Sequence, residues 1–216
     1  MLTIIFDLDG TLVDSSVDLM IAGNATFEQL GWKVRLSEDF SDGVVIGGGR
    51  SMLRYGLMSE RIDFTEDDVN RLYPKLIANY DKTIDDNTVA YEGVEETLKN
   101  LKNRGWRIGL CTNKPKRQAD LLLTKLGMRS FFESFVGAGT TTTVKPHSEP
   151  LIAAVEALNG TMERTVLVGD TKTDRDTAIA AGAKCLLVNY GHGALVYDLN
   201  ELHPEALVDS AIEIPE

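Results

Sequence analysis

The chain has 216 residues, of which 43% are hydrophobic, 25% charged and 7% aromatic. This composition is typical of a globular protein and excludes a disordered, fibrous or disulfide-stapled one. Its 22 basic and 33 acidic residues give a net charge of −11, which argues against nucleic acid or an anionic membrane surface as a partner. Small anions remain candidate ligands, because a site can be locally positive on an acidic protein.

The cysteines and the first residues indicate the cellular compartment. Cys111 and Cys185 lie far apart in apolar runs, where cysteine acts as a small buried hydrophobic residue. The initial segment MLTIIFDLDGT lacks the basic start of a signal peptide, and no apolar run approaches the roughly 18 residues of a membrane span. We therefore expect a cytoplasmic protein. The sequence leaves open whether it is a monomer or a homodimer.

Short apolar runs alternate with amphipathic helical patterns along most of the chain. This alternation is typical of a doubly wound, Rossmann-like α/β fold. The runs are almost continuously apolar, which predicts parallel strands covered by helices on both faces. The predicted strands are residues 2–7, 106–111, 134–137, 165–169 and 184–188.

The region between the first two predicted strands is too long for a simple crossover. A crossover needs about a dozen residues, whereas residues 14–90 carry helical patterns and no convincing strand. We therefore predict an α/β core of residues 1–13 and 91–216, with residues 14–90 inserted as a helical cap over the carboxyl edge of the sheet. The glycine run 47–49 predicts a tight bend within this cap.

Two of the predicted strands end in pairs of carboxylates, Asp7 with Asp9 and Asp170 with Asp174. In open α/β sheets, ligands bind at the carboxyl ends of the strands. One carboxylate of such a pair can hold a hard cation and attack as a nucleophile, while the other acts as acid and base. Gly10 lets the chain turn and point its backbone N–H at an anion. Alone, either segment could equally be an Asx turn or a helix cap.

Two further segments gain meaning only in combination. Thr112 or Asn113 can cap a helix after the second predicted strand, with Pro115 in its first turn. The N-terminus of such a helix can bind phosphate, although a well-capped helix needs no ligand. Lys145 precedes another predicted helix and alone would be a solvated surface charge.

Taken in their order along the chain, the four segments resemble the motifs of the haloacid dehalogenase-like superfamily of phosphohydrolases. The helical insertion resembles that superfamily's C1-type cap, so the resemblance covers nearly the whole chain. It implies that Asp7 is the nucleophile, Asp9 the general acid and base, and Lys145 the lysine that steadies the charged intermediate.

The resemblance also implies a cofactor and the residues that bind it. Mg²⁺ is the expected cofactor, with Asp174 in or near its outer shell and with direct ligands from Asp7, Asp170 and the Asp9 backbone carbonyl. The residues expected to bind the phosphate of the substrate are Gly10, Thr112 and Asn113.

Three stretches resemble bacterial phosphoglycolate phosphatases within this superfamily: TNKP at 112–115, KPHSEPL at 145–151 and VNYGHG at 188–193. They imply hydrolysis of 2-phosphoglycolate to glycolate and phosphate through an aspartyl-phosphate intermediate. Substrate choice is expected to depend on the cap, where Arg50 could pair with the substrate carboxylate. An unpaired surface arginine fits the sequence equally well.

Several alternatives share part of this pattern. A phosphatase of another small metabolite, such as a sugar phosphate or a nucleotide, would carry the same motifs. A sugar-phosphate mutase would too, although a bulkier residue than Thr11 would be expected there. A haloacid dehalogenase needs neither a metal nor the second acid. A phospho-receiver module, the non-enzymatic alternative, is short and lacks the long helical insertion.

Overall fold

The computed structural model describes residues 2–214 and separates into two compact units. The first, here called the α/β unit, comprises the residues up to Asp14 and those from Val89 onward; the second, the helical unit, is Ser15–Thr88. These divisions fall one and two residues from the sequence-based boundaries. Strand β2 (Val13–Asp14) pairs antiparallel with β3 (Val89–Ala90), so the two connecting segments run side by side within the α/β unit.

The sheet of the α/β unit contains six parallel strands in the order β5-β4-β1-β6-β7-β8. Five of them match the predicted apolar runs, which confirms the doubly wound α/β fold. The sixth, β8, was not predicted and lies at one edge of the sheet beside β7. The strands are β1 (Thr3–Phe6), β4 (Arg107–Pro115), β5 (Ser134–Ala138), β6 (Thr165–Gly169), β7 (Lys184–Val188) and β8 (Ala206–Val208).

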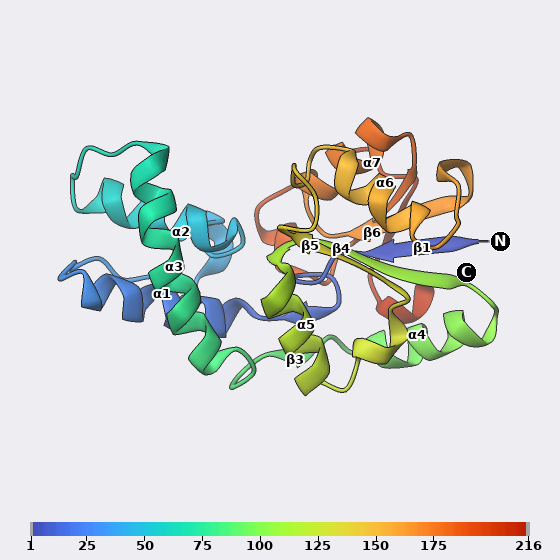
Figure 1. Ribbon diagram of the computed structural model, residues 1–216, viewed down its shortest axis with the longest axis horizontal. Coiled ribbons are helices and arrows are strands. Elements are labelled where there is room, and N and C mark those ends of the chain that lie inside the picture. Colours follow the sequence, from blue (N-terminus) through green and yellow to red (C-terminus); the bar gives the residue numbers. More distant parts are fainter. Residues whose placement is uncertain (1, 215–216) are drawn as a thin grey trace. The chain divides into compact units, whose positions relative to one another are not determined.

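Helices cover both faces of this sheet, as the apolar character of its strands requires. In Figure 1, α4 (Val94–Asn103) and α5 (Lys116–Lys125) lie on one face, and α6 (Glu149–Glu156) and α7 (Lys172–Ala181) on the other. The side chains between the layers are fully buried, among them Ile5, Leu167 and Leu187. Both cysteines are buried without a disulfide, as their apolar surroundings predicted.

Strand β1 occupies the point at which the chain changes direction across the sheet. From β1 the chain continues to β4 and β5 on one side, and then returns to β6, β7 and β8 on the other. Such a switch opens a crevice at the carboxyl ends of the central strands. The segments that follow β4, β1 and β6 are therefore placed next to one another.

One local prediction for this edge is wrong. Thr112 and Asn113 do not cap a helix, because β4 continues to Pro115 and α5 begins only at Lys116. The pairing of β4 with β5 is irregular between Cys111 and Pro115 and resumes where Pro115 faces Ala138. This renewed pairing keeps the segment extended.

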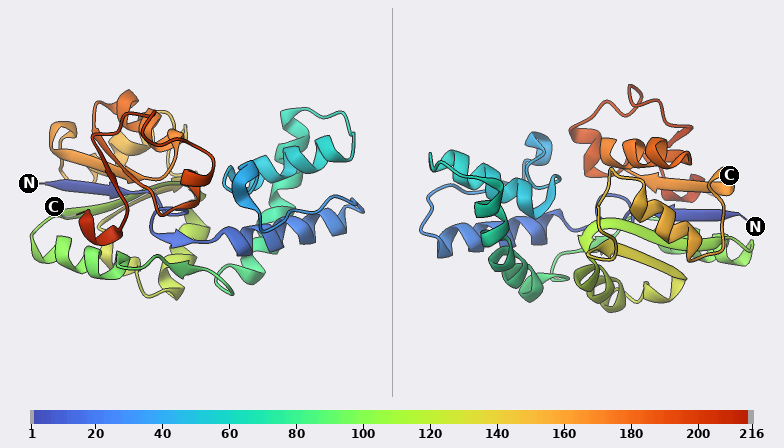
Figure 2. Two further views of the ribbon diagram at one scale, coloured as in Figure 1. Left: turned by 180° about the vertical axis from the view of Figure 1, so that it is seen from behind. Right: turned by 45° about the horizontal axis from the view of Figure 1, so that its top comes forward.

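The helical unit consists of α1 (Ser16–Gln29), α2 (Gly48–Ser59) and α3 (Glu66–Thr83), with a short 3-10 turn at Phe40–Asp42. The three helices pack against one another, as the two views in Figure 2 show. Gly48 has a φ of +76° at the start of α2, which is the bend predicted from the glycine run.

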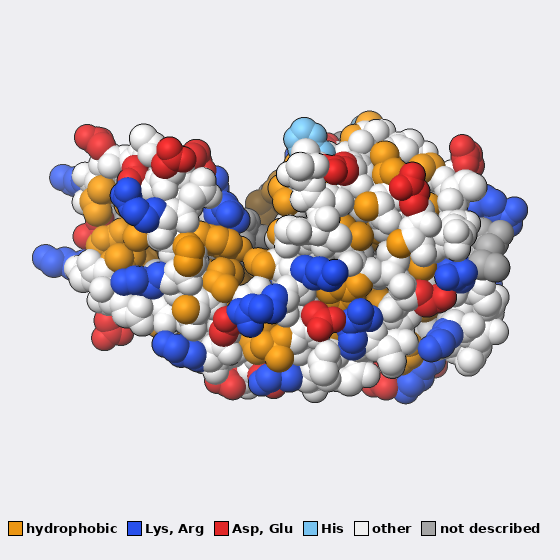
Figure 3. All heavy atoms as spheres, in the orientation of Figure 1, with side chains coloured by type: hydrophobic (Ala, Val, Ile, Leu, Met, Phe, Trp, Pro, Cys, Tyr) orange, Lys and Arg blue, Asp and Glu red, His pale blue; other side chains and the backbone are white. Residues whose placement is uncertain are grey.

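The distribution of charge on the surface and the hydropathy of the helices are relevant to possible partners. On the face shown in Figure 3, basic and acidic side chains are interspersed on both units. Among the described residues, none of the helices combines the length and hydropathy that a membrane span requires. The chemistry-bearing residues instead gather at the carboxyl edge of the sheet.

Candidate active site

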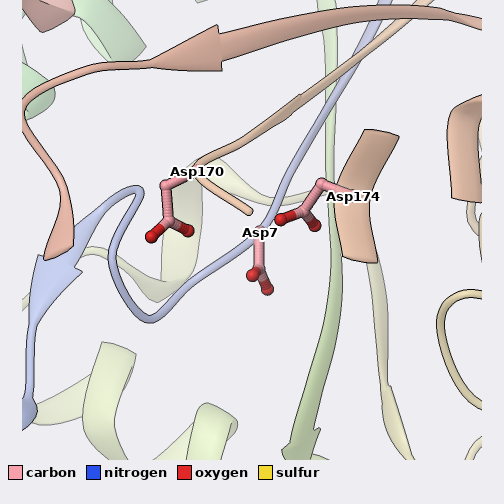
Figure 4. Close-up of side chains that lie close together, drawn as sticks. All are labelled: Asp7, Asp170 and Asp174. Atoms are coloured by element: carbon pink, nitrogen blue, oxygen red, sulfur yellow. The ribbon is translucent and has the colours of Figure 1, made fainter. Parts of the chain in front are cut away.

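Three carboxylates from three segments meet at this edge. Asp7 follows β1, Asp170 follows β6, and Asp174 lies in the first turn of α7. One carboxylate oxygen from each lies within 4.8 Å of the other two, and Figure 4 shows the three side chains together. Carboxylate oxygens at this spacing can hold a hard divalent cation.

The position of Asp174 is set by the start of α7. Thr171 is the N-cap residue, and its hydroxyl and backbone N–H donate to Asp174 Oδ2 at 2.7 and 3.2 Å. This reciprocal capping box favours the start of α7 at this point of the sequence. It leaves Asp174 Oδ1 turned toward the rest of the cluster.

Lys145 supplies the positive charge of the cluster. Its Nζ lies 2.6 Å from Asp174 Oδ1 and 3.0 Å from Asp7 Oδ1, and its side chain is only 2% exposed. Burial alone would lower the Lys145 pKa, but the neighbouring carboxylates, Asp174 first and then Asp7, raise it above its usual value. Lys145 therefore remains a fixed cation beside Asp7.

The acids of the cluster outnumber this one lysine. Burial, with a further contribution from Asp174, raises the pKa of Asp7 from 3.8 to about 6 although Lys145 opposes the shift. Burial and then the charges of Asp174 and Asp7 raise the pKa of Asp170 well above its usual value. A site with these properties fits a bound cation, which would offset the excess negative charge.

Asp170 is held by the chain around it. Its two oxygens accept from the Thr11 hydroxyl and the Gly193 backbone N–H, each at 3.1 Å. Gly10 has a φ of +82°, and a Cβ there would stand 2.2 Å from Asp170 Oδ2. A Cβ on Gly193 would stand 1.9 Å from the Asp170 carbonyl oxygen. Only glycine fits at either position.

The loop after β7 makes contacts with the site that the sequence did not predict. Besides the Gly193 contact, Tyr190 donates its hydroxyl to the Thr11 carbonyl oxygen at 3.0 Å. A Cβ on Gly191 would stand 2.0 Å from the Gly10 carbonyl oxygen. The glycine spacing in VNYGHG was the available signal, since paired glycines permit close approach of two backbones.

Thr112 and Asn113 lie at the same edge, at the end of β4. Thr112 is buried, and its hydroxyl accepts from the Lys114 backbone N–H at 3.2 Å. Asn113 bridges to the backbone of Lys145: its Nδ2 donates to the Lys145 carbonyl, and its Oδ1 accepts from the Lys145 N–H, both at 2.9 Å. Asn113 thus ties the lysine-bearing segment to β4, and phosphate binding by these residues stays a prediction.

Asp9 lies in the turn after β1 and contacts a residue that the sequence did not single out. Lys114 Nζ donates to Asp9 Oδ1 at 2.8 Å. A lysine three residues past an apolar strand gives no sequence signal of burial. The contact depends on the pairing of β4 with β1, which is a tertiary feature of the fold.

Arg50 belongs to the helical unit, and its role stays a prediction. It lies in the first turn of α2, where its Nε donates to Asn70 Oδ1 at 3.3 Å. Its guanidinium stacks 3.9 Å from the centroid of the Tyr73 ring.

The edge of the sheet therefore places the Asp7 carboxylate beside the Lys145 ammonium, within a group of three carboxylates whose oxygens could hold a cation. A further carboxylate, that of Asp9, lies two residues after Asp7. An oxygen nucleophile facing a cation and an ammonium suits attack on an anionic centre such as a phosphate ester.

Known proteins resemble this chain over most of its length. Residues 4–188 match the family model described as haloacid dehalogenase-like hydrolase. A phosphoglycolate phosphatase from Colwellia psychrerythraea is 34% identical over 98% of this chain and 94% of its own. One from Cereibacter sphaeroides is 36% identical over 88% of this chain and 85% of its own. A crystal structure of a predicted phosphoglycolate phosphatase from Haemophilus somnus superposes with a TM-score of 0.86 at 24% identity, covering 99% of this chain and 96% of that one.

Proposed function

Because the chain belongs to the haloacid dehalogenase-like hydrolase family, we propose that it is a Mg²⁺-dependent phosphomonoesterase that hydrolyses 2-phosphoglycolate to glycolate and phosphate. The observation that carries this proposal is the placement of Asp7 beside Lys145 within the carboxylate cluster. The curated relatives named phosphoglycolate phosphatase support the substrate.

The residues of the cluster fit a magnesium ion. Mg²⁺ takes oxygen ligands and keeps several waters, so a small set of carboxylates is sufficient. We assign the ligands to Asp7, Asp170 and the Asp9 backbone carbonyl, with Asp174 close by. When bound, the ion would screen the negative charge of the phosphate from the attacking carboxylate.

In the first proposed step, Asp7 attacks the phosphorus of the substrate. A new bond forms between an Asp7 carboxylate oxygen and phosphorus, and the bond between phosphorus and the glycolate oxygen breaks. Asp9 gives a proton to the departing oxygen, which would otherwise leave as a strongly basic alkoxide. Lys145 holds Asp7 in place and offsets the charge that gathers around the phosphoryl group.

In the second step, Asp9 takes a proton from water, which attacks the phosphorus of the aspartyl phosphate. The bond from phosphorus to Asp7 breaks, phosphate is released, and both carboxylates regain their starting forms. Splitting one difficult displacement into two easier ones is the advantage of a covalent intermediate.

We further propose that the phosphate oxygens contact Thr112, Asn113 and the backbone at Gly10, and that Arg50 of the helical unit pairs with the substrate carboxylate. Thr112 and Gly10 both lie at the carboxyl edge of the sheet. A planar guanidinium suits a carboxylate because it can form two parallel hydrogen bonds.

Phosphate release from a substrate panel tests this proposal. The panel contains 2-phosphoglycolate, sugar phosphates, nucleotides and p-nitrophenyl phosphate, each with and without Mg²⁺. We expect metal-dependent turnover with the highest kcat/KM for 2-phosphoglycolate. Metal-dependent turnover without selectivity would refute the substrate, and no release from any ester would refute the phosphatase.

A further inference from the structure

Lys114 is a buried lysine that the mechanism so far does not use. Its side chain is 3% exposed, whereas the Asp9 side chain that it contacts is 30% exposed. Lysine is rarely this deeply buried without a specific partner, and its Nζ lies 2.8 Å from Asp9 Oδ1. The ion pair joins the end of β4 to the turn after β1, which are neighbours in the sheet.

The backbone around Lys114 fixes where its side chain starts. The pairing of β4 with β5 is irregular between Cys111 and Pro115, and such irregularities redirect side chains. The Lys114 backbone N–H donates to the Thr112 hydroxyl at 3.2 Å. Gly137 of β5 packs directly on this segment, since a Cβ there would stand 2.9 Å from the Lys114 carbonyl oxygen and 2.6 Å from Lys116 Cα.

We propose that Lys114 is a positioning residue for Asp9, holding one carboxylate oxygen so that the other is directed at the oxygen that leaves the substrate. Proton transfer depends on a donor within hydrogen-bond reach of the reacting atom. The contact at 2.8 Å ties the Asp9 carboxylate, in the turn after β1, to a buried lysine at the end of β4. The inference rests on the proposed function, because it assigns Asp9 the role of acid.

Lys114 differs in role from Lys145. Lys145 contacts Asp7 and Asp174, so its loss affects the nucleophile and therefore every substrate. Lys114 contacts the acid, and its loss slows the formation of the aspartyl phosphate only for substrates whose leaving group requires a proton. An alkyl ester such as 2-phosphoglycolate requires one, whereas p-nitrophenyl phosphate releases a stabilised phenolate without it.

The experiment compares kcat/KM for these two substrates in Lys114→Met, Lys114→Gln and the wild-type enzyme, all with Mg²⁺. This ratio reports the steps through formation of the aspartyl phosphate, in which only the alkyl ester needs the acid. Methionine is similar to lysine in shape, and the Asp9 side chain is 30% exposed, so water can solvate its carboxylate when the lysine charge is removed. Glutamine provides a second variant if the first fails to fold. Lys99→Met is the matched control, because Lys99 forms an exposed pair with Glu95 on α4.

We expect the Lys114 variants to lose at least ~10-fold more kcat/KM on 2-phosphoglycolate than on p-nitrophenyl phosphate, a part of the 10²–10⁴-fold that a general acid contributes. Asp9→Asn should show the same selectivity with a larger loss, and Lys114→Arg should restore part of it. Equal losses on both substrates in folded Lys114 variants would overturn the inference, since they indicate a merely structural lysine. If wild-type enzyme prefers another alkyl phosphate, the proposed substrate fails while the same comparison, made with that ester, still tests Lys114.

Discussion

Replacing the proposed nucleophile should stabilise the metal-free protein. Asp7 lies in a buried cluster where its pKa rises from 3.8 to about 6, mainly through burial. A carboxyl group with a higher pKa in the folded chain binds its proton more tightly there than in the unfolded chain. Folding stability therefore falls as the pH rises from 3.8 through about 6, and the full cost persists at higher pH.

The size of this effect follows from the shift. Each pKa unit corresponds to about 1.4 kcal/mol, so the ionised Asp7 carboxylate lowers the free energy of unfolding by about 3 kcal/mol at pH 8. At pH 5, where the folded form is still largely protonated, the cost is about 2 kcal/mol. Asp7→Asn removes the charge, so its advantage over the wild-type chain should grow by about 1 kcal/mol between these two pH values.

Urea denaturation with EDTA at pH 5 and pH 8 measures this difference. Asp63→Asn, which changes an exposed carboxylate in the loop after α2, is the control for a general effect of the substitution. Mg²⁺ should then stabilise the wild-type chain more than Asp7→Asn, because a cation that binds the folded state adds stability by mass action. An Asp7→Asn protein that is less stable than wild type at pH 8 without metal, or an advantage that does not grow with pH, would refute the reasoning.

Three further outcomes are expected. Lys145→Met leaves two buried carboxylates without their cation, so it should lower the free energy of unfolding by about 3–5 kcal/mol. It should also remove nearly all turnover. An unchanged denaturation midpoint would contradict this prediction. Gly10→Ala places a Cβ 2.2 Å from Asp170 Oδ2 at a φ of +82°, so it should lower stability by about 1–3 kcal/mol and weaken metal binding in a calorimetric titration. Arg50→Ala should raise KM for 2-phosphoglycolate more than for p-nitrophenyl phosphate, and equal changes would show that Arg50 does not read the carboxylate.

Much of the sheet could be predicted from the sequence because its central strands are apolar on both faces. Residues 165–169 and 184–188 were predicted with the bounds that β6 and β7 have in the structure. Strand β8 was missed, since it has three residues in an acidic segment and carries no pattern long enough to recognise. Its position depends on pairing with β7, which is a tertiary contact.

The candidate site shows the same division between local and tertiary information. Asp7 and Asp170 could be identified because each follows an apolar strand, and parallel strands bring such residues to one edge. The capping role expected for Thr112 and Asn113 was wrong because pairing with β5 keeps that segment extended. Lys114 gave no signal, because a lysine in sequence is usually a solvated charge.

Trapping the covalent intermediate tests the central claim most directly. The enzyme is mixed with 2-phosphoglycolate and Mg²⁺, quenched in acid within a single turnover, digested and analysed by mass spectrometry. We predict a phosphoryl group on the peptide that contains Asp7, which appears and decays at rates consistent with turnover and is absent from Asp7→Asn. Phosphate release at the normal rate with no phosphorylated Asp7, or with the phosphoryl group on another residue, would contradict the proposed mechanism.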